Sequence, residues 1–184
     1  MHPSADSRQR AHPEPACMPS NAAERRAGGV CLVVFSGELD KLMAAFVMAT
    51  GAAASGLPVH MFFTFWATHG LRRSRGAGSG RSLTERALCW MIPAGWRRRR
   101  LSHLHWGGLG RRMLRREMRR KGVADLPTLV ELAARLGVSI NVCEMSMDLM
   151  GIQREDLIDY PGLSVCGVAG FLQRSTVATN TLFI

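Results

Sequence analysis

The sequence lacks the cysteine pairs of common metal and redox motifs, and it lacks an apolar secretion signal. Its five cysteines, an odd number, form no Cys-x-x-Cys pair. The first 29 residues are polar and contain several prolines, without the apolar centre of a signal peptide. These absences argue against a secreted disulfide scaffold. We therefore expect a cytoplasmic protein with reduced thiols, whose cysteines are at positions 17, 31, 89, 143 and 166.

Lysine is nearly absent, and arginine carries the positive charge in one part of the chain. The formal net charge is +10, although the only lysines are Lys41 and Lys121. Residues 72–121 contain fifteen Arg and one Lys against two Glu, a net of +14, so the remainder sums to −4. The basicity is therefore a property of one segment and not of the whole protein.

No recognisable metal-binding pattern is present. His103 and His105, with Cys89, His60 or His69, would supply donor atoms, but their spacing matches no zinc motif. We interpret His103 and His105 as local surface residues. Neither a metal ion nor another cofactor is expected.

What the chain does contain is an alternation of apolar runs and helix-forming stretches, in a length that supports one core. Residues 1–29 are expected to form a disordered leader, and 30–184 a single α/β domain with a basic insert at 72–122. The expected strands are 30–35, 59–65, 138–142, 163–168 and 180–184; the expected helices are 42–54, 125–136, 154–159 and 169–178. This alternation favours right-handed crossovers, so the predicted fold is a three-layer α/β sandwich with a mostly parallel sheet of about five strands.

Two local features refine this prediction. Asp125 is the expected N-cap of the helix that follows it, and Gly137 is expected to end that helix. The uncharged stretch from Leu42 to Val59 approaches the length of a membrane-spanning helix. Glycine, serine and proline interrupt it, so we favour a core helix followed by a strand over a membrane span.

Cys143 lies where the third predicted strand ends, in Gly137-Val-Ser-Ile-Asn-Val-Cys143-Glu-Met-Ser-Met-Asp148-Leu-Met-Gly151. In an open α/β sheet, ligands and reactive groups gather beyond the carboxyl ends of the strands. A thiol reacts as thiolate, which a helix starting at Ser146 or Asp148 would favour and the charges of Glu144 and Asp148 would oppose. The alternative is a buried structural cysteine.

The segment Cys-x-Met-Ser-Met-Asp-x-Met-Gly that begins at Cys143 resembles the signature of the DsrE/DsrF-like sulfur-relay proteins, in particular the branch often labelled "peroxiredoxin family". The resemblance extends from about Val30 to Ile184. Further matching pieces are Phe35-Ser-Gly37-Glu-Leu-Asp40-Lys41, Gly51-Ala-Ala-Ala-Ser-Gly56, Phe62-Phe-Thr-Phe-Trp66, Gly107-Gly-Leu-Gly110, Leu157-Ile-Asp159, Gly167-Val-Ala169 and Asn180-Thr-Leu-Phe-Ile184. The resemblance implies a DsrE/YchN-like parallel-sheet fold, a homo-oligomer and a cysteine that carries sulfur as a persulfide. The apolar residues at 62–66 and 182–184 also favour a homo-oligomer.

Two functions are compatible with these features. In the first, a sulfur carrier or sulfurtransferase, Cys143 accepts a sulfane sulfur and passes it to a thiol carrier such as a TusA-like or rhodanese-like protein. Here Cys166 is the candidate resolving thiol, although Cys31 and Cys166 both lie inside predicted strands and are expected to fill the core. In the second, the same fold is a non-catalytic module that binds a small anion or another protein. Peroxide reduction is not expected, because the Pro-x-x-x-Thr-x-x-Cys arrangement of peroxiredoxins does not precede Cys143.

Other residues are expected to line the same edge of the sheet. The turn from Gly37 to Lys41 follows the first strand and could hold an anion through its backbone N–H groups and the lysine ammonium, or it is a tight turn with helix-capping charges. The aromatic residues at 62–66 either roof this edge or form a buried strand and subunit contact. The candidate anion-binding or lining residues are Gly37, Asp40, Lys41, Trp66, Ser146 and Asp148.

The arginine runs at 97–100 and 111–121 form the centre of the basic insert. The second run places Met113, Leu114 and Met118 at helical spacing, which predicts a cationic amphipathic helix. The segment 97–121 would contact an acidic partner, would associate peripherally with an anionic membrane surface, or would remain a solvated charged face. Nucleic acid is disfavoured, because the runs lack interleaved aromatic residues and match no known module.

Overall fold

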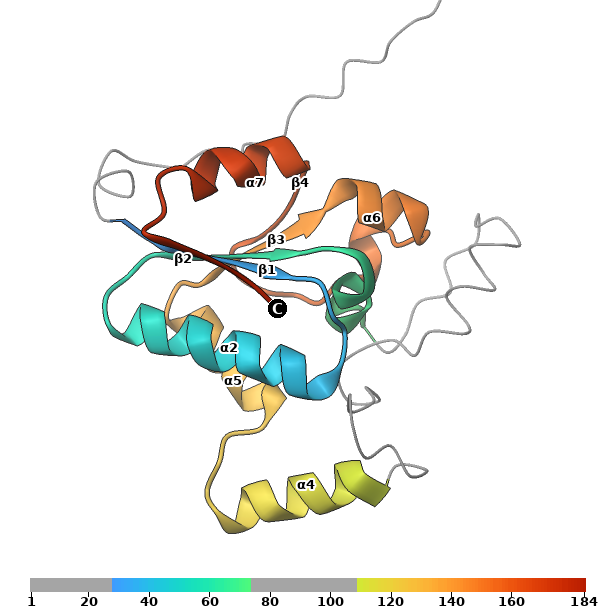
Figure 1. The fold of residues 1–184 in the computed structure, drawn as a ribbon. Helices are drawn as coiled ribbons and strands as arrows, with labels where there is room; N and C mark the ends of the chain where they lie inside the picture. The colour runs from blue at the N-terminus through green and yellow to red at the C-terminus, as the bar shows by residue number, and fades with distance from the viewer. Residues whose placement is uncertain (1–27, 74–108) are drawn as a thin grey trace, which may run out of the picture.

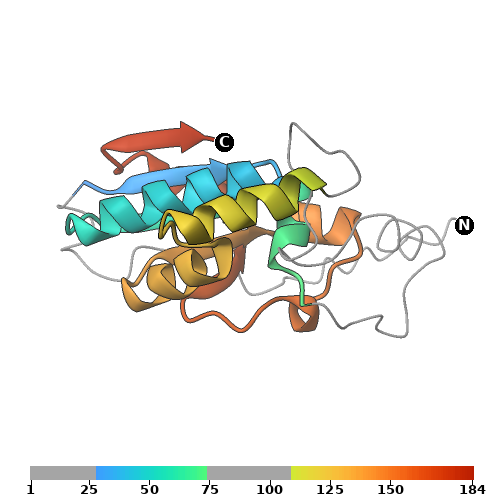
Figure 2. The ribbon, with the colours of Figure 1, turned by 90° about the horizontal axis from the view of Figure 1, so that it is seen from below.

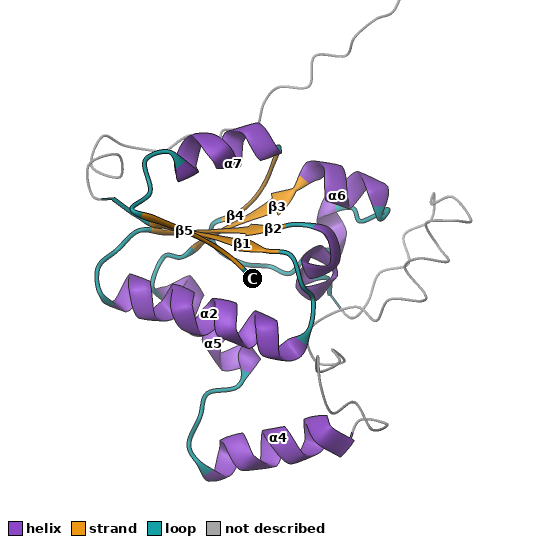
Figure 3. Ribbon diagram, in the orientation of Figure 1, coloured by secondary structure: helices purple, strands orange, loops and turns teal. Residues whose placement is uncertain are grey.

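The structure is a computed structural model of the 184-residue chain, and it describes residues 28–73 and 109–184. Residues 1–27 of the expected leader and 74–108 of the expected insert lie outside the described part. Five strands form one parallel sheet, and helices lie on both of its faces (Figure 1, Figure 3). The predicted three-layer α/β sandwich is confirmed.

The sheet has the strand order β4-β3-β2-β1-β5, and every neighbouring pair is parallel. The strands are β1 (Val30–Val34), β2 (Val59–Phe63), β3 (Ser139–Cys143), β4 (Leu163–Cys166) and β5 (Asn180–Phe183). Because the strands are parallel, the carboxyl ends of β1, β2, β3 and β4 meet at one edge. Residues that follow these strands are therefore brought together there, although they are far apart in the sequence.

The helices form unequal layers on the two faces. Helices α2 (Leu39–Ala54) and α5 (Leu126–Arg135) cover one face, and α7 (Val168–Ser175) covers the other (Figure 1). Helix α4 (Leu109–Arg120) lies outside the layer of α2 and α5, and Figure 2 shows it in front of α2 and nearly parallel to it. At the carboxyl ends of the strands are α6 (Glu144–Leu149) and the 3-10 helix η1 (Phe65–Leu71); a second 3-10 helix, η4 (Arg154–Asp156), precedes β4.

The main core lies between the sheet and helices α2 and α5. Alternate residues of the strands point into it, because successive side chains of a strand face opposite sides. The fully buried side chains include Leu32, Val34, Met61, Phe63, Ile140, Val142, Leu42 and Phe46. Both faces of the sheet are covered, which explains why the strands appear in the sequence as continuous apolar runs.

The structure confirms both signals that were expected to delimit the helix at 125–136. The Asp125 carboxylate accepts a hydrogen bond from the backbone N–H of Thr128 at 3.2 Å and so caps α5. Gly137 follows the helix with φ of +73°, a left-handed conformation in which glycine avoids the steric cost of a Cβ.

Several predicted boundaries were wrong, and backbone conformation explains most of them. Helix α2 begins at Leu39 and not at Leu42, since the extended Glu38 already serves as its N-cap. Strand β2 ends at Phe63 because Phe65 turns the chain with φ of +46°. The helix expected at 154–159 is the single 3-10 turn of η4, closed by a reciprocal capping box between Gln153 and Asp156.

Strand β4 and the helix after it also depart from their predicted ranges. The strand expected to reach residue 168 ends at Cys166, because Gly167 is the N-cap of α7, which runs over Val168–Ser175 and not over 169–178.

The 16-residue α2 packs against the sheet, and no helix within the described residues has the length and apolarity needed to cross a bilayer. The stretch from Leu42 to Val59 is therefore a core helix followed by the start of a strand, as favoured from the sequence.

Candidate functional site

Two cysteines occupy the carboxyl ends of neighbouring strands. Cys143 is the last residue of β3 and Cys166 the last residue of β4, and the register pairs their Cα atoms directly. Neighbouring strands lie about 4.8 Å apart, and residues in register point to the same face. The two thiols are therefore neighbours, although 22 residues separate them in the sequence.

Both thiols face α7, in a small cluster separate from the main core. The cluster comprises Cys31, Phe62, Cys143, Cys166 and Phe171, and the two edge cysteines are 0% and 1% exposed. The ring of Phe171 stacks on that of Phe62 with 4.6 Å between centroids. Helix α7 thus covers the cysteines through one aromatic side chain. All three cysteines of the cluster are reduced thiols.

Cys31 differs from the other two cysteines by its place in the strand and by its electrostatics. It lies near the start of β1, far along the strand direction from the edge that holds Cys143. Burial raises the pKa of the Cys31 thiol from 9.0 to about 11, and the nearby positive charge of Arg174 offsets only part of this shift. Cys31 therefore stays protonated near neutral pH and is a poor nucleophile, in agreement with its expected role in the core.

Ser146 joins the residues after β3 to those after β2. Its Oγ accepts a hydrogen bond from the backbone N–H of Phe65 and shares a hydrogen bond with Thr64 Oγ1, both at 3.0 Å. Phe65 is held with positive φ, and its carbonyl accepts a 2.6 Å hydrogen bond from Thr68 Oγ1. These hydrogen bonds fix η1 against α6 beside Cys143, and the role of Ser146 in a functional site stays a prediction. Residues 62–66 were expected at this edge, but the hydrogen bonds themselves were not predicted, because they join residues 81 and 82 positions apart.

The turn after β1 is closed by its own charged residues. The Lys41 ammonium lies 2.8 Å from the Glu38 carboxylate, and Ser36 Oγ donates to that carboxylate at 3.2 Å. The hydrogen bond and the negative charge of Glu38 raise the pKa of Lys41, which favours the protonated ammonium. The same carboxylate also compensates the positive charge of that ammonium. Asp40 lies in the first turn of α2, and Gly37 is buried in the turn. An anion at this turn would have to compete with Glu38, which favours the helix-capping interpretation of these residues.

The outer surface of α6 carries two kinds of exposed side chain beside Cys143. Glu144 and Asp148 form an acidic row at i and i+4, and Met145 and Leu149 form an apolar row with the same spacing. Trp66, 48% exposed, stands on η1, which packs against α6. The apolar row was missed from the sequence, since α6 was expected to begin only at Ser146 or Asp148. The helical spacing of Met145 and Leu149 was the available signal.

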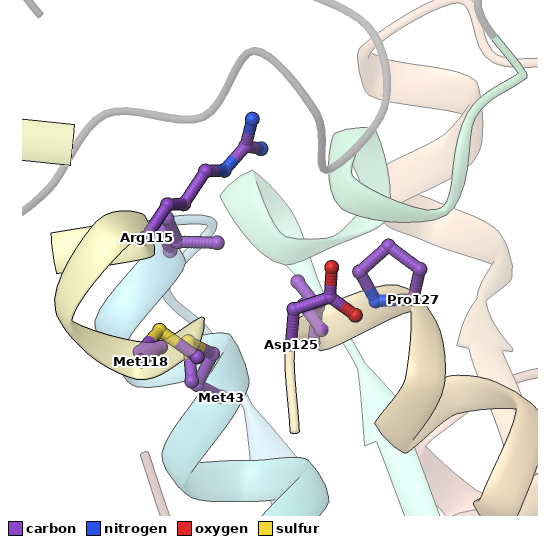
Figure 4. Close-up of a pocket in the computed structure, with 7 residues that line it drawn as sticks. Met43, Arg115, Met118, Asp125 and Pro127 are labelled. Atoms are coloured by element: carbon purple, nitrogen blue, oxygen red, sulfur yellow. The ribbon is translucent and has the colours of Figure 1, made fainter. Parts of the chain in front are cut away.

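Helix α4 confirms the predicted cationic helix over the second arginine run, with one difference. Met118 is buried and Leu114 is half-buried, but Met113 is 73% exposed and lies away from the packed side. Figure 4 shows the cleft between α4 and the layer beneath it, with Met118 next to Met43, and with Arg115 of α4 across from Asp125 and Pro127. Leu39 and Leu126 complete its lining. The buried Met118 packs α4 against the layer beneath it.

The described residues contain no cluster of three or more histidine, cysteine, aspartate or glutamate side chains that could hold a metal ion. His60 contacts Arg174 of α7 at 3.1 Å from its Nδ1, and His69 is buried in η1. His103, His105 and Cys89 lie outside the described part of the chain.

Comparison with known proteins agrees with this geometry. The chain is 36% identical over 153 residues to the uncharacterized protein YrkE of Bacillus subtilis (strain 168), a match that covers 83% of this chain and 94% of YrkE. It is 26% identical over 161 residues to the sulfur carrier protein DsrE2 of Allochromatium vinosum, covering 84% and 97%. Among solved structures, the YchN protein from E. coli shares the fold with a TM-score of 0.52 at 14% identity, over 85% of this chain and 99% of YchN. The sequence profile of the DsrE/DsrF/DrsH-like family matches residues 27–183, and the chain belongs to this family.

Proposed function

We propose that the protein is a sulfur carrier that holds sulfane sulfur as a persulfide on Cys143. The observation that carries this proposal is the pair of thiols at the carboxyl edge of β3 and β4, in a chain related to a sulfur carrier protein. Carriage of this kind needs a thiol that can be reached by a partner and does not need a large substrate pocket. The arrangement of α6, η1 and α7 around this edge supplies a defined surface for such a partner.

The loading step conserves atoms and electrons without an added oxidant. The Cys143 thiolate attacks the outer sulfur of a donor persulfide, R–S–SH, and forms a new S–S bond. The S–S bond of the donor breaks, and R–S⁻ leaves and takes up the proton. The donor becomes an ordinary thiol, and the protein carries Cys143–S–SH.

Cys166 is proposed as the resolving thiol because it is the in-register neighbour of Cys143. Its thiolate attacks the outer sulfur of Cys143–S–SH, which moves the persulfide to Cys166 and restores the Cys143 thiol. Attack on the inner sulfur instead forms a Cys143–Cys166 disulfide and releases HS⁻. The same two outcomes apply when the attacking thiol belongs to a TusA-like or rhodanese-like carrier, which we propose as the class of acceptor.

Burial of both thiols requires that the site opens during transfer. Cys143 is fully buried beneath α7, so a donor reaches it only when Phe171 moves. The helix that must move is short, and Phe171 is its one buried side chain. Local opening of such a weakly packed element costs less than global unfolding, so the burial is compatible with a carrier function.

Mass spectrometry of the intact protein after incubation with polysulfide tests the proposal. Each sulfur atom transferred adds about 32 Da, and peptide mapping after alkylation assigns its position. Cys143→Ser should abolish the added mass, and Cys166→Ser should leave loading intact but slow its release. Cys31→Ser is the matched control, since this thiol is equally buried but lies far from the edge. Full loading of Cys143→Ser would show that Cys143 is not the carrier.

The proposed carrier is also a homo-oligomer that functions in the cytoplasm. Phe62 and Phe63 are buried within the chain and cannot supply a subunit contact, so that part of the sequence interpretation is replaced. Phe183 is 71% exposed on the edge strand β5, beside exposed Leu182. Their side chains point to opposite faces of the strand, and exposed apolar side chains on an edge strand are typical of an interface between subunits. Light scattering without detergent should give a mass above that of the 20.2 kDa monomer, and a monomer would contradict the proposal.

A further inference from the structure

Two exposed helical surfaces of the chain carry the same pattern with opposite charge. On α4, Arg112 and Arg116 are exposed at i and i+4, with exposed Met113 beside them. On α6, Glu144 and Asp148 are exposed at i and i+4, with Met145 beside them, 51% exposed. The first surface thus reads Arg-Met-x-x-Arg and the second Glu-Met-x-x-Asp. Leu149, 59% exposed, extends the apolar row of the second surface.

The charge on α4 is poorly compensated within the helix itself. Glu117 contacts Arg120 and lies 3.6 Å from Lys121, so its carboxylate serves the carboxyl-terminal end of α4. Arg112 and Arg116 repel each other across one turn, and like charges at i and i+4 each cost a few tenths of a kcal/mol. Carboxylates placed opposite Arg112 and Arg116 would attract both guanidinium groups and so offset their mutual repulsion.

The two surfaces cannot meet within one molecule. Helix α4 lies outside the layer of α2 and α5, and α6 lies at the carboxyl ends of the strands, toward the opposite face of the sheet (Figure 1, Figure 2). The sheet and α2 stand between them. A pairing of these two surfaces therefore joins two molecules, and the complementary pattern of charges points to a second copy of this chain.

We propose that the amino-terminal half of α4 in one copy docks antiparallel on α6 of a second copy. This docking places Arg112 opposite Asp148 and Arg116 opposite Glu144, with Met113 against the row formed by Met145 and Leu149. The two surfaces differ, so the contact is head-to-tail and leaves a vacant α4 at one end and a vacant α6 at the other. It also brings the neighbouring copy to the edge that holds Cys143.

A bilayer is a poorer occupant of α4 than a second copy. An interfacial helix inserts a continuous apolar face into the lipid. In α4 the apolar residues Leu114 and Met118 are turned toward the body of the protein, and Met113 is the exposed apolar residue among its described side chains. A single methionine among arginines fits a small apolar row such as that of α6.

The contact is small and relies on exposed ion pairs, so it should be weak and sensitive to salt. Screening shortens the range of these charges from about 10 Å at 0.1 M salt to about 3 Å at 1 M. Weight-average mass against concentration, from sedimentation equilibrium at low and high salt, measures the contact directly. An apolar contact through β5 would persist at high salt, whereas the contact of α4 with α6 would be lost.

A charge swap tests the pairing of the two surfaces. One variant carries Arg112→Glu and Arg116→Glu, and the other carries Glu144→Lys and Asp148→Lys. The matched controls make the same changes of net charge on exposed residues elsewhere, through Arg135→Glu with Arg154→Glu, and Glu131→Lys with Glu155→Lys. All substituted side chains are exposed, so the fold should survive, and circular dichroism verifies it.

In each swapped variant alone, the association constant at low salt should fall by about tenfold or more, because like charges then face each other. An equimolar mixture of the two should recover it, since the acidic α4 of one variant meets the basic α6 of the other. The controls should associate like the parent. Salt-independent association of the parent, or a mixture that fails to recover, would overturn the pairing. None of these outcomes depends on whether Cys143 carries sulfur.

Discussion

The two faces of the sheet differ in composition and in how they are covered. The face toward α2 and α5 buries aliphatic and aromatic side chains from β1, β2 and β3 in one large cluster. The face toward α7 buries only a small cluster, in which three of the five members are cysteines. Asn141 and Ser164 share this second face, joined by a 2.8 Å hydrogen bond. One face therefore supplies most of the stability, and the other carries the cysteines, among them the reactive thiols of the proposed function.

The difference fits the proposed carrier function, which requires one small domain to be stable and also to open at its cysteines. Stability grows with the apolar area removed from water, which the larger cluster provides. The reactive face needs a cover that can open, and α7 is held mainly by Phe171 and by the contact of Arg174 with His60. The following predictions test this division of roles.

The largest effect is expected from the face toward α2 and α5. Phe46→Ala should lower the free energy of unfolding by about 3–5 kcal/mol, because a fully buried ring that packs against Phe63 leaves a cavity. Urea denaturation measures the loss. Val47→Ala, at an exposed position on the same helix, is the control and should change stability by less than about 0.5 kcal/mol.

A smaller loss of stability, with a gain of reactivity, is expected on the other face. Phe171→Ala should cost about 2–3 kcal/mol, since α7 is exposed on its outer side and can relax into the space. The same change should speed maleimide labelling of Cys143 by about tenfold or more, because the site opens more often. Leu172→Ala, on the exposed side of α7, serves as control. Equal rates of Cys143 labelling in Phe171→Ala and in the parent would show that Phe171 does not control access to this cysteine.

A dependence of stability on alkaline pH is expected from Cys31, on the face toward α7. The folded pKa of Cys31, about 11, lies above its usual value of 9.0, so the unfolded chain ionises first as pH rises. The stabilisation is complete below about pH 9 and falls by about 2 kcal/mol as pH rises through 11. Cys31→Ala should flatten this part of the pH profile of unfolding. A raised pKa of Tyr160 acts in the same direction and remains in the variant as an internal reference.

The smallest effect concerns a helix end on the α2 and α5 face. Asp125→Ala removes the cap of α5 and should cost about 1 kcal/mol at neutral pH. Hydrogen bonds from Thr128 lower the pKa of Asp125, so the contribution is present at neutral pH and is lost as the solution becomes acidic. Asp125→Asn should retain most of the stability and lose the acid dependence. An unchanged acid profile in Asp125→Asn would show that other carboxylates control this range.

The fold could be predicted from the sequence because local patterns determine it. Apolar runs such as the one starting at Val30 identify covered strands, and the cap Asp125 and the stop Gly137 delimit a helix. Alternation of the two elements then fixes a parallel sheet. These signals involve residues close together in the sequence, and the resemblance carried by the segment after Cys143 agrees with them.

The details of the site could not be predicted in the same way. The hydrogen bonds of Ser146 with Thr64 and Phe65, and the pairing of Cys143 with Cys166, depend on strand order and register. No local pattern encodes either one. The start of α6 was misplaced because Cys143 is both the last residue of β3 and the N-cap of the helix, which leaves no turn sequence between them.

The strand order attaches both ends of α7 to the sheet. The chain leaves β4 at one edge of the sheet and enters β5 at the other. The connection that contains α7 therefore crosses over β3, β2 and β1 and is joined to a strand at each end. Its trailing end is short and is fixed to Gly29 through the backbone N–H groups of Thr179 and Asn180. Its leading end begins at Gly167, where an added Cβ would meet nothing within 4 Å. In the proposed function, the opening that exposes Cys143 must therefore bend the chain at Gly167 or extend the short connection to β5, because both ends of α7 are attached to strands of the sheet.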